Sequence, residues 1–198
     1  MIIEEWIRFL INPKKVIKAE AKYVSFAKGI KHILFSVLIY TLMNYIFGSI
    51  PYSASFGIIL DFIILFAAIS LFIFTGWVML SGIYYTFAVS VFGGKGTIDA
   101  QSYFLSIIFA ELFVLTGLTK ILPFPLSTAA DIIIFLYILF LTNVMLKEVH
   151  RLSYDRAFLS WFIPLILFFY LALISGMILY SILEYILIGA QQTSFIFL

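Results

Sequence analysis

The sequence predicts an all-α membrane protein: a bundle of five transmembrane helices that follows an amphipathic N-terminal helix lying at the membrane interface. Hydrophobic residues make up 64% of the 198 residues, and charged residues make up only 11%. Five long apolar runs are separated by short polar breaks, and about 20 apolar residues are enough for a helix to cross the hydrocarbon core. The runs are continuously apolar and do not alternate at every second residue, which excludes the strands of a membrane β-barrel.

Residues 1–32 differ from the rest and are predicted to form a cytoplasmic, interfacial segment. On a helical wheel the first eleven residues separate into two sides. The apolar side carries Ile2, Ile3, Trp6, Ile7 and Leu10, and the charged side carries Glu4, Glu5 and Arg8. A short helix of this kind lies in the plane of the interface, with Trp6 at the depth of the headgroups.

A second helix is predicted to begin at Asn12-Pro13, because asparagine is a good helix cap and proline suits the first helical position. We expect it to continue towards Ile30, with one face formed by Lys14, Lys15, Lys18 and Lys22. These lysines contact lipid headgroups and set the topology, or they form a dedicated site for an anionic lipid or an acidic partner protein. The sequence leaves both interpretations open, since each such lysine adds about 1 kcal/mol of generic attraction to an anionic surface.

The five spans make up the second predicted region, residues 33–190, which precedes a short non-cytoplasmic tail at 191–198. We place the spans at 33–50, 56–92, 101–122, 127–146 and 158–188. As a helix the 56–92 run would extend about 55 Å, which is more than one straight crossing. We expect one tilted helix that projects past the membrane, or a crossing helix followed by a short interfacial one. Pro164 is a candidate kink in the fifth span.

The distribution of Lys and Arg predicts the orientation. With five spans and a cytoplasmic N-terminus, the inner segments 1–32, 93–100 and 147–157 hold seven, one and three of the 12 basic residues. The outer segments hold only Lys120. Basic residues concentrate on the cytoplasmic side of membrane proteins, so we expect the N-terminus to be cytoplasmic and the C-terminus to lie outside or in a lumen.

Acidic residues in or beside the apolar runs are candidates for function, because ionisable groups are costly in hydrocarbon. Asp61, Asp131 and Glu184 lie towards the outer ends of their spans, where they are expected to reach headgroups or water, with Lys120 as a partner. Glu111 differs, because it lies about 15 Å deep in the third span.

The surroundings of Glu111 lead to two interpretations. Ser102, Ser106 and Ala110 form a stripe of small residues beside it, which favours a central, closely packed third span with Glu111 facing protein. Asn143 and Asn44 are the expected amide partners of Glu111. The residue is then either a protonated, hydrogen-bonded packing residue or part of a polar cavity for a headgroup, a proton or a small solute.

The sequence offers little material for catalysis or for metal binding. It has no cysteine and only two histidines, His32 and His150, so no metal site and no cofactor are expected. Residues 93–97, GGKGT, follow a membrane helix and lack the order of a Walker phosphate-binding loop. We interpret them as a tight turn that needs permissive backbone dihedrals, and we expect no enzymatic activity.

Four features together resemble the Yip family, the Ypt/Rab-interacting membrane proteins and their prokaryotic relatives. They are Asn12-Pro13 after an amphipathic helix, VFGGKGT at 91–97, KEVHRLSYDRAF at 147–158, and five spans with a cytoplasmic N-terminus. The residues of the two signature loops are Gly93, Gly94, Lys95, Gly96 and Thr97, then Lys147, Glu148, His150 and Arg151. Both loops fall on the predicted cytoplasmic face. There we expect Lys95 or Thr97 to contact the second loop and tie spans two to five together, with ligand binding as the alternative role.

The resemblance implies an integral membrane protein without known enzymatic activity. Eukaryotic members look like organisers of vesicle traffic that bind prenylated small GTPases and shape tubular membranes, and they usually carry a long soluble N-terminal region. The short N-terminal segment here favours a prokaryotic member in the cell membrane; a eukaryotic member would lie in the ER or Golgi.

We therefore expect a non-enzymatic protein that organises membrane or partner proteins through its cytoplasmic face and its interfacial helix. Its expected partners are the lipid bilayer, anionic headgroups and a protein at the cytoplasmic face, with no nucleic acid. The alternative is a small transporter or lipid carrier with a polar cavity around Glu111, in which a homodimer would supply the second half.

Overall fold

The structure is a computed structural model that describes the backbone of residues 2–47 and 57–194 and the side chains of 2–47, 57 and 59–180. The described residues form seven α-helices and one π-helical segment, without strands. In chain order they are α1 (Ile2–Ile11), α2 (Pro13–Glu20), α3 (Phe26–Ile46), α4 (Ile58–Thr86), η1 (Phe87–Val91), α5 (Ile98–Thr119), α6 (Leu126–His150) and α7 (Tyr154–Ser194).

Five of these helices are long and apolar enough to cross a membrane, as the sequence predicts. The expected single long helix over 56–92 is confirmed for its described part, because α4 continues without a break into η1 and ends at Val91. The first span begins earlier than expected, at Phe26 instead of residue 33, and its predicted end at residue 50 lies outside the described residues. The chain forms two compact units, Met1–Trp161 and Phe162–Leu198, and each is described by itself.

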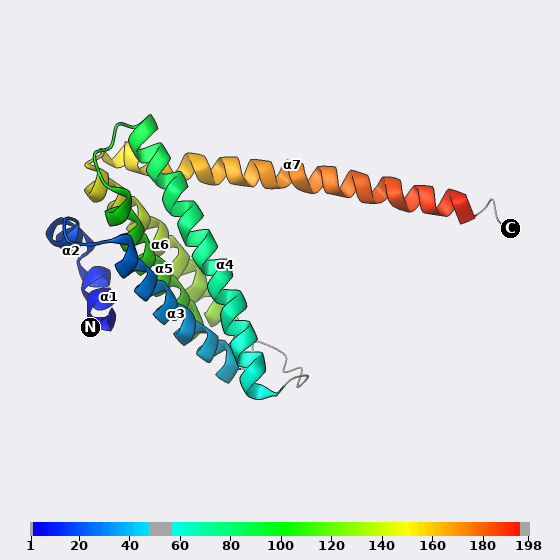
Figure 1. Cartoon of the computed structure of the whole chain (residues 1–198), viewed down its shortest axis with the longest axis horizontal. Coiled ribbons are helices and arrows are strands. Elements are labelled where there is room, and N and C mark those ends of the chain that lie inside the picture. Colours follow the sequence, from blue (N-terminus) through cyan, green and yellow to red (C-terminus); the bar gives the residue numbers. More distant parts are fainter. Residues whose placement is uncertain (1, 48–56, 195–198) are drawn as a thin grey trace. The chain divides into compact units, whose positions relative to one another are not determined.

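In the first unit, α3, α4, α5 and α6 lie side by side, with α3 and α5 running in one direction and α4 and α6 in the other (Figure 1). The central helix is α5, which contacts α1, α3, α4 and α6. Its small residues Ser102, Ser106 and Ala110 are completely buried. Opposite them, a Cβ placed on Gly29 of α3 would lie 3.2 Å from Ser106 Oγ. The predicted central, closely packed third span is confirmed.

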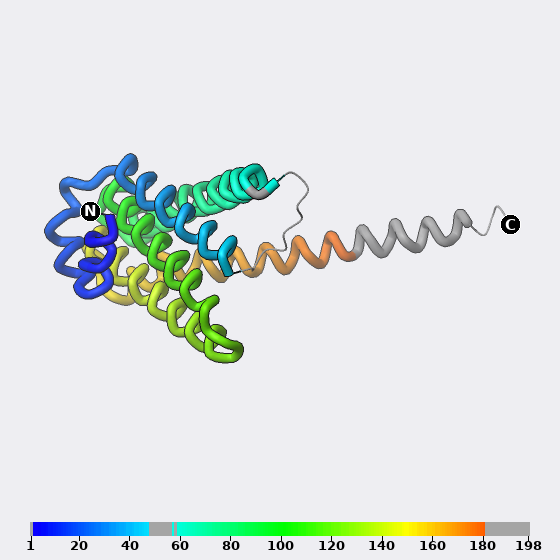
Figure 2. Tube along the Cα trace, turned by 90° about the horizontal axis from the view of Figure 1, so that it is seen from below, coloured from blue at the N-terminus to red at the C-terminus, as the bar shows by residue number. Residues whose placement is uncertain are grey.

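The N-terminal region folds differently from the single long helix expected after Asn12-Pro13. The Oδ1 atom of Asn12 does cap α2, accepting a hydrogen bond from the backbone N–H of Lys15 at 3.4 Å. However, α2 ends at Glu20, and a new cap at Ser25 starts α3 one residue later. The chain therefore turns between α2 and α3, and α1 and α2 lie beside the end of the bundle at which α3 begins (Figure 2).

The second unit consists of α7 from Phe162 onwards. The helix continues through Pro164. Its described side chains are apolar on every side, which is the pattern of a helix surrounded by hydrocarbon. The side chain of Glu184 lies outside the described residues.

Candidate functional site

One end of the first unit collects the segments that the sequence singles out. The backbone N–H of Lys95 donates to the carbonyl oxygen of His150 at 3.0 Å, which joins the two signature loops. The Nζ atom of Lys18 lies 3.6 Å from Glu148 Oε2, which joins α2 to the second loop. We call this end, which carries α2, residues 92–97 and residues 147–156, the basic end. The predicted contact of Lys95 with the second loop is confirmed.

The glycine turn has a steric reason for each of its three glycines. Gly93 adopts a φ of 71°, in the left-handed region that glycine tolerates. A Cβ on Gly94 would lie 2.8 Å from both the Ala88 oxygen and His150 Cβ. A Cβ on Gly96 would lie 2.6 Å from the Val149 oxygen. The turn is therefore a site of close backbone approach to the end of α6.

The His150 side chain holds three helices together. Its Nε2 atom lies 2.7 Å from Gln101 Oε1, and Gln101 Nε2 donates to the Ser81 carbonyl oxygen at 2.7 Å. The amide oxygen of Gln101 accepts, so His150 Nε2 is the donor. All three residues are buried. The sequence analysis identified His150 but missed Gln101 and Ser81, because nothing in their local sequence indicates a contact across helices.

Of the other charged residues that the sequence singles out in this loop, Arg151 is exposed, and Lys147 and Glu148 are half-buried. The Lys147 Nζ atom lies 5.6 Å from the centre of the Tyr154 ring. Arg151 is exposed and ends α6 with a φ of 56°, in the left-handed region. The backbone N–H of Leu152 reaches back to the Lys147 oxygen at 3.1 Å, which closes a Schellman-type helix end.

The four lysines predicted to share a face are all exposed at this end: Lys14, Lys15, Lys18 and Lys22. Lys22 lies in the turn after α2, and the other three lie on α2. Together with Arg8, Lys28, Lys31, Lys95, Lys147, Arg151 and Arg156 they amount to 11 of the 12 basic residues of the chain. The described part of the opposite end carries Lys120, in the turn between α5 and α6.

Trp6 is not open to the membrane interface as the interfacial helix predicts. Trp6 is 5% exposed and Phe9 is completely buried, so this side of α1 packs on protein. The Trp6 indole Nε1–H donates to Nδ1 of His32 at 2.7 Å. The Phe9 ring stacks on Phe104 with centroids 5.8 Å apart. Both aromatic residues fill the core because α1 crosses the bundle surface at α3 and α5.

A polar cluster lies beneath α1. The Glu5 carboxylate oxygen Oε2 is 3.2 Å from His32 Nε2 and accepts from the Tyr103 hydroxyl at 3.3 Å. Tyr137 on α6 donates its hydroxyl to the Leu10 carbonyl at 2.7 Å. These bonds fix both ends of α1. Sequence reasoning placed Glu5 on the solvent side and so missed its role as an anchor.

A third side of α1 remains open. Ile3, Ile7 and Ile11 follow one another at intervals of four residues and are 46%, 51% and 79% exposed. At this spacing they form one stripe along the helix. The part of the expected interfacial helix that is free to meet lipid is therefore this isoleucine stripe, and not Trp6.

Glu111 lies inside the bundle, as the sequence predicts, at 2% exposure. The predicted pairing with the two asparagines is wrong. Neither carboxylate oxygen of Glu111 has a hydrogen-bond partner among the described residues, and neither does Asn143 Oδ1. The Asn44 amide instead donates to the Tyr40 carbonyl at 2.8 Å, within its own helix. A carboxyl group without donors in such surroundings requires a proton or a cation as its partner.

The expected contact of the outer-end acids with headgroups or water stays a prediction, and Asp61 is half-buried. Asp131 is half-buried and accepts a hydrogen bond from the Thr119 hydroxyl at 2.6 Å, so its partner is Thr119 and not Lys120. Across the described residues, no three His, Cys, Asp or Glu side chains lie together as metal ligands.

Comparison with protein families decides what kind of chain this is. The Yip1 domain matches residues 9–176. The chain belongs to the Yip1 domain family. The Yip1 domain match begins within α1 and includes α2, both signature loops and the first four spans. No curated protein and no solved structure matches the chain.

Membership of the Yip1 domain family agrees with the resemblance inferred from the two signature loops. The chain is thus an integral, multi-pass membrane protein. Within the Yip1 domain, Gly94, Gly96 and His150 have structural roles, because they hold the second loop against the first. The basic end and the isoleucine stripe remain as the surfaces open to a partner.

Proposed function

We propose that this Yip1 domain protein is non-enzymatic and organises the bilayer or partner proteins through its basic end and α1. The observation that supports the proposal is the isoleucine stripe of Ile3, Ile7 and Ile11 on a helix anchored by its opposite side. Each of these side chains gains about 1–2 kcal/mol on moving from water into hydrocarbon. A helix that is fixed to the bundle and inserted by one side couples the bundle to the leaflet.

The charge distribution supports a cytoplasmic position for the basic end. Eleven of the 12 basic residues lie on the basic end, on α1, in the turn after α2 or in the first turns of α3, and cytoplasmic leaflets are rich in anionic lipid. We therefore propose that the N-terminus is cytoplasmic and that the C-terminus lies on the other side. Reporter fusions at the two termini test this: a cytoplasmic reporter active at Leu198 contradicts it.

Membrane shaping is the activity that tests this proposal. Full-length protein is reconstituted into vesicles. Microscopy then measures how many vesicles form tubules and how strongly the protein is enriched on curved membrane. Replacing Ile3, Ile7 and Ile11 with serine is expected to abolish most of the effect, whereas replacement with leucine keeps it. Deleting residues 1–11 is a poorer test, because it also removes Trp6 and Phe9 from the core. Full shaping activity of the serine variant would overturn the proposal.

A second candidate function is a small transporter or lipid carrier, and Glu111 is the observation that favours it. Its carboxyl group is 2% exposed and has no donor among the described residues, which is typical of a group that exchanges a proton or a cation. Solute or lipid flux in vesicles that depends on Glu111, and is lost in Glu111→Gln, would support this function in place of the first.

A further inference from the structure

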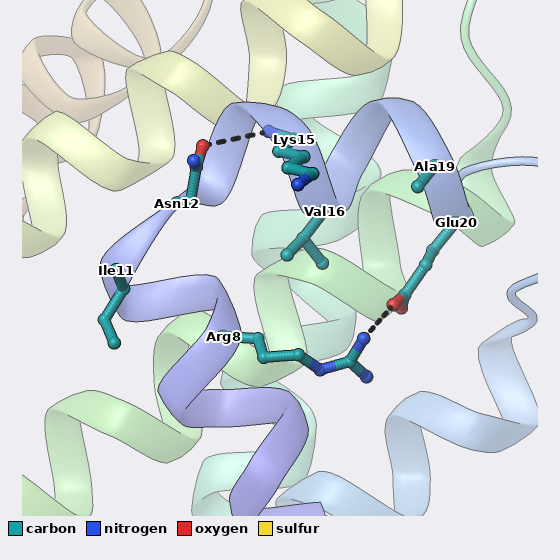
Figure 3. Close-up of a pocket in the computed structure, with 7 residues that line it drawn as sticks. All are labelled: Arg8, Ile11, Asn12, Lys15, Val16, Ala19 and Glu20. Atoms are coloured by element: carbon teal, nitrogen blue, oxygen red, sulfur yellow. Dashed lines mark hydrogen bonds and ion pairs between the residues drawn. The ribbon is translucent and has the colours of Figure 1, made fainter.

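A groove between α1 and α2 lies at the surface of the basic end (Figure 3). Its volume is about 370 Å³, and it is lined by Arg8, Ile11, Asn12, Lys15, Val16, Ala19 and Glu20. Its size falls within the usual range for small-molecule sites, about 300–1,000 Å³.

The polar side of the groove suits a phosphate group. Arg8 and Lys15 supply two positive charges, and Glu20 supplies the one negative charge of the lining. The Arg8 Nη1 atom lies 3.4 Å from Glu20 Oε1, and Figure 3 marks this ion pair with a dashed line. Within the described part of the chain this ion pair orients the guanidinium group and engages one of its nitrogens. Arginine binds phosphate through two parallel N–H donors, and the remaining N–H groups of Arg8 are its candidate donors.

The apolar side of the groove distinguishes a lipid from a soluble anion. Ile11, Val16 and Ala19 line it with carbon, which a free phosphate does not need. Ile11 also ends the isoleucine stripe and is 79% exposed. The groove and the stripe therefore share a residue, so an acyl chain beside the stripe can continue to a headgroup in the groove.

We propose that this groove binds the phosphate of an anionic phospholipid, with Arg8 and Lys15 as its cationic ligands and Ile11 and Val16 against its glycerol and first acyl carbons. The inference rests on the proposed function, since it requires α1 to lie in the leaflet. It adds a lipid class and names the residues that select it. Glu20 competes with the phosphate for Arg8, so the acid limits affinity and keeps the arginine in place when the groove is empty.

The absence of cysteine from the chain makes a direct binding test simple. Tyr23, which is 76% exposed in the turn after α2, is replaced by cysteine and labelled with a fluorophore in the full-length protein. The protein is placed in phosphatidylcholine nanodiscs that contain nitroxide-labelled phosphatidylglycerol or nitroxide-labelled phosphatidylcholine. The ratio of quenching by the two lipids measures enrichment of the anionic lipid near the groove.

We expect enrichment of phosphatidylglycerol and a loss of about fivefold in Arg8→Gln and in Lys15→Gln, the scale of one charged contact at a membrane surface. Glu20→Gln should increase enrichment, because it frees Arg8. The matched control is Lys14→Gln, which removes the same charge from the same helix but lies outside the lining. An equal loss of enrichment in Lys14→Gln would overturn the proposed binding site. It would mean that only the general attraction between lysines and anionic lipid remains.

A second experiment tests whether inorganic phosphate competes with the lipid for the groove. At equal ionic strength, replacing chloride with phosphate is expected to leave the enrichment unchanged. Complete displacement of the lipid by phosphate assigns the groove to a soluble ligand and overturns the proposal. If Arg8→Gln and Lys15→Gln keep the lipid enrichment while the protein still shapes vesicles, this inference alone is refuted. Full shaping activity of the serine variant of the stripe refutes the proposed function.

Discussion

The indole Nε1–H of Trp6 donates to Nδ1 of His32 across 2.7 Å, and both side chains are buried. An indole nitrogen is only a donor, so His32 Nδ1 must be the acceptor in this pair. The other ring nitrogen then carries the proton and faces the Glu5 carboxylate at 3.2 Å. One neutral tautomer of His32 therefore satisfies two groups of α1 at once and fixes the helix to α3.

The Trp6–His32 bond predicts the effect of Trp6→Phe. The change leaves a buried acceptor on His32 without its donor, which costs about 1–3 kcal/mol. We expect faster hydrogen exchange at the amides of α1, with the bundle helices unchanged. Trp77→Phe is the control, because it removes an indole bond of similar length, 2.9 Å to the Ser102 carbonyl, from α4 and α5. Equal protection of α1 in the Trp6 variant and the original protein would refute the anchor.

Close backbone approach at Gly96 predicts a steric penalty for Gly96→Ala. The new Cβ would lie 2.6 Å from the Val149 oxygen and 2.7 Å from His150 Nδ1, so backbone must move, at a cost of about 1–3 kcal/mol. We expect a lower melting temperature in detergent. Gly76→Ala is the matched control, since nothing lies within 4 Å of its Cβ and alanine favours a helix interior. If the two variants melt together, the two loops are not in close contact.

The left-handed backbone of Arg151 predicts opposite effects for two substitutions. At a φ of 56°, glycine relieves a strain of about 1 kcal/mol, whereas a β-branched valine increases it. We expect Arg151→Gly to melt at or above the temperature of the original protein and Arg151→Val to melt below it. A more stable valine variant would contradict the backbone conformation. Both variants remove the same charge. Any contribution of the Arg151 charge to stability or to binding is therefore lost equally in both.

Several elements of this fold can be predicted from the sequence alone. Continuous apolar runs predicted the five long helices, since hydrocarbon requires internal hydrogen bonding along the whole segment. Gly93 and its neighbours predicted the turn, because clustered glycines are typical of a chain that needs backbone dihedrals or close contacts that other residues do not allow. The central position of α5 followed from Ser102, Ser106 and Ala110, whose small side chains let other helices approach.

The contact of Lys95 with the second signature loop was predicted, but the contacts that α1, Gln101 and Glu111 make with distant segments were not. An amphipathic wheel divides α1 into two sides, but the helix has three: Trp6 and Phe9 on protein, Glu5 on His32, and the isoleucine stripe exposed. Apolarity alone does not distinguish a side that meets protein from one that meets lipid. The contact of Gln101 with His150, and the absence of a hydrogen-bond partner for Glu111 among the described residues, depend on the exact register of α5 and α6. Periodicity in the sequence does not set that register.

The missing donors of Glu111 predict a gain in stability on its removal. Glu111→Leu replaces a buried carboxyl group that lacks partners among the described residues with an apolar side chain of similar length. We expect stabilisation by about 1–3 kcal/mol, seen as a higher melting temperature. The Glu111→Gln control keeps a polar group and is expected to gain nothing. Destabilisation by leucine would mean that the carboxyl group has a stabilising partner in the membrane.

The central claim, that α1 meets the membrane through its isoleucine stripe, is tested most directly by measuring depth. Single-cysteine variants Ile7→Cys and Lys14→Cys are spin-labelled in the full-length protein in nanodiscs, and their collision rates with oxygen and with a water-soluble nickel complex are compared. We predict that the label at Ile7 favours oxygen, as lipid-buried positions do, and that the label at Lys14 favours nickel. Equal access of nickel to both labels would place α1 in water and contradict the account.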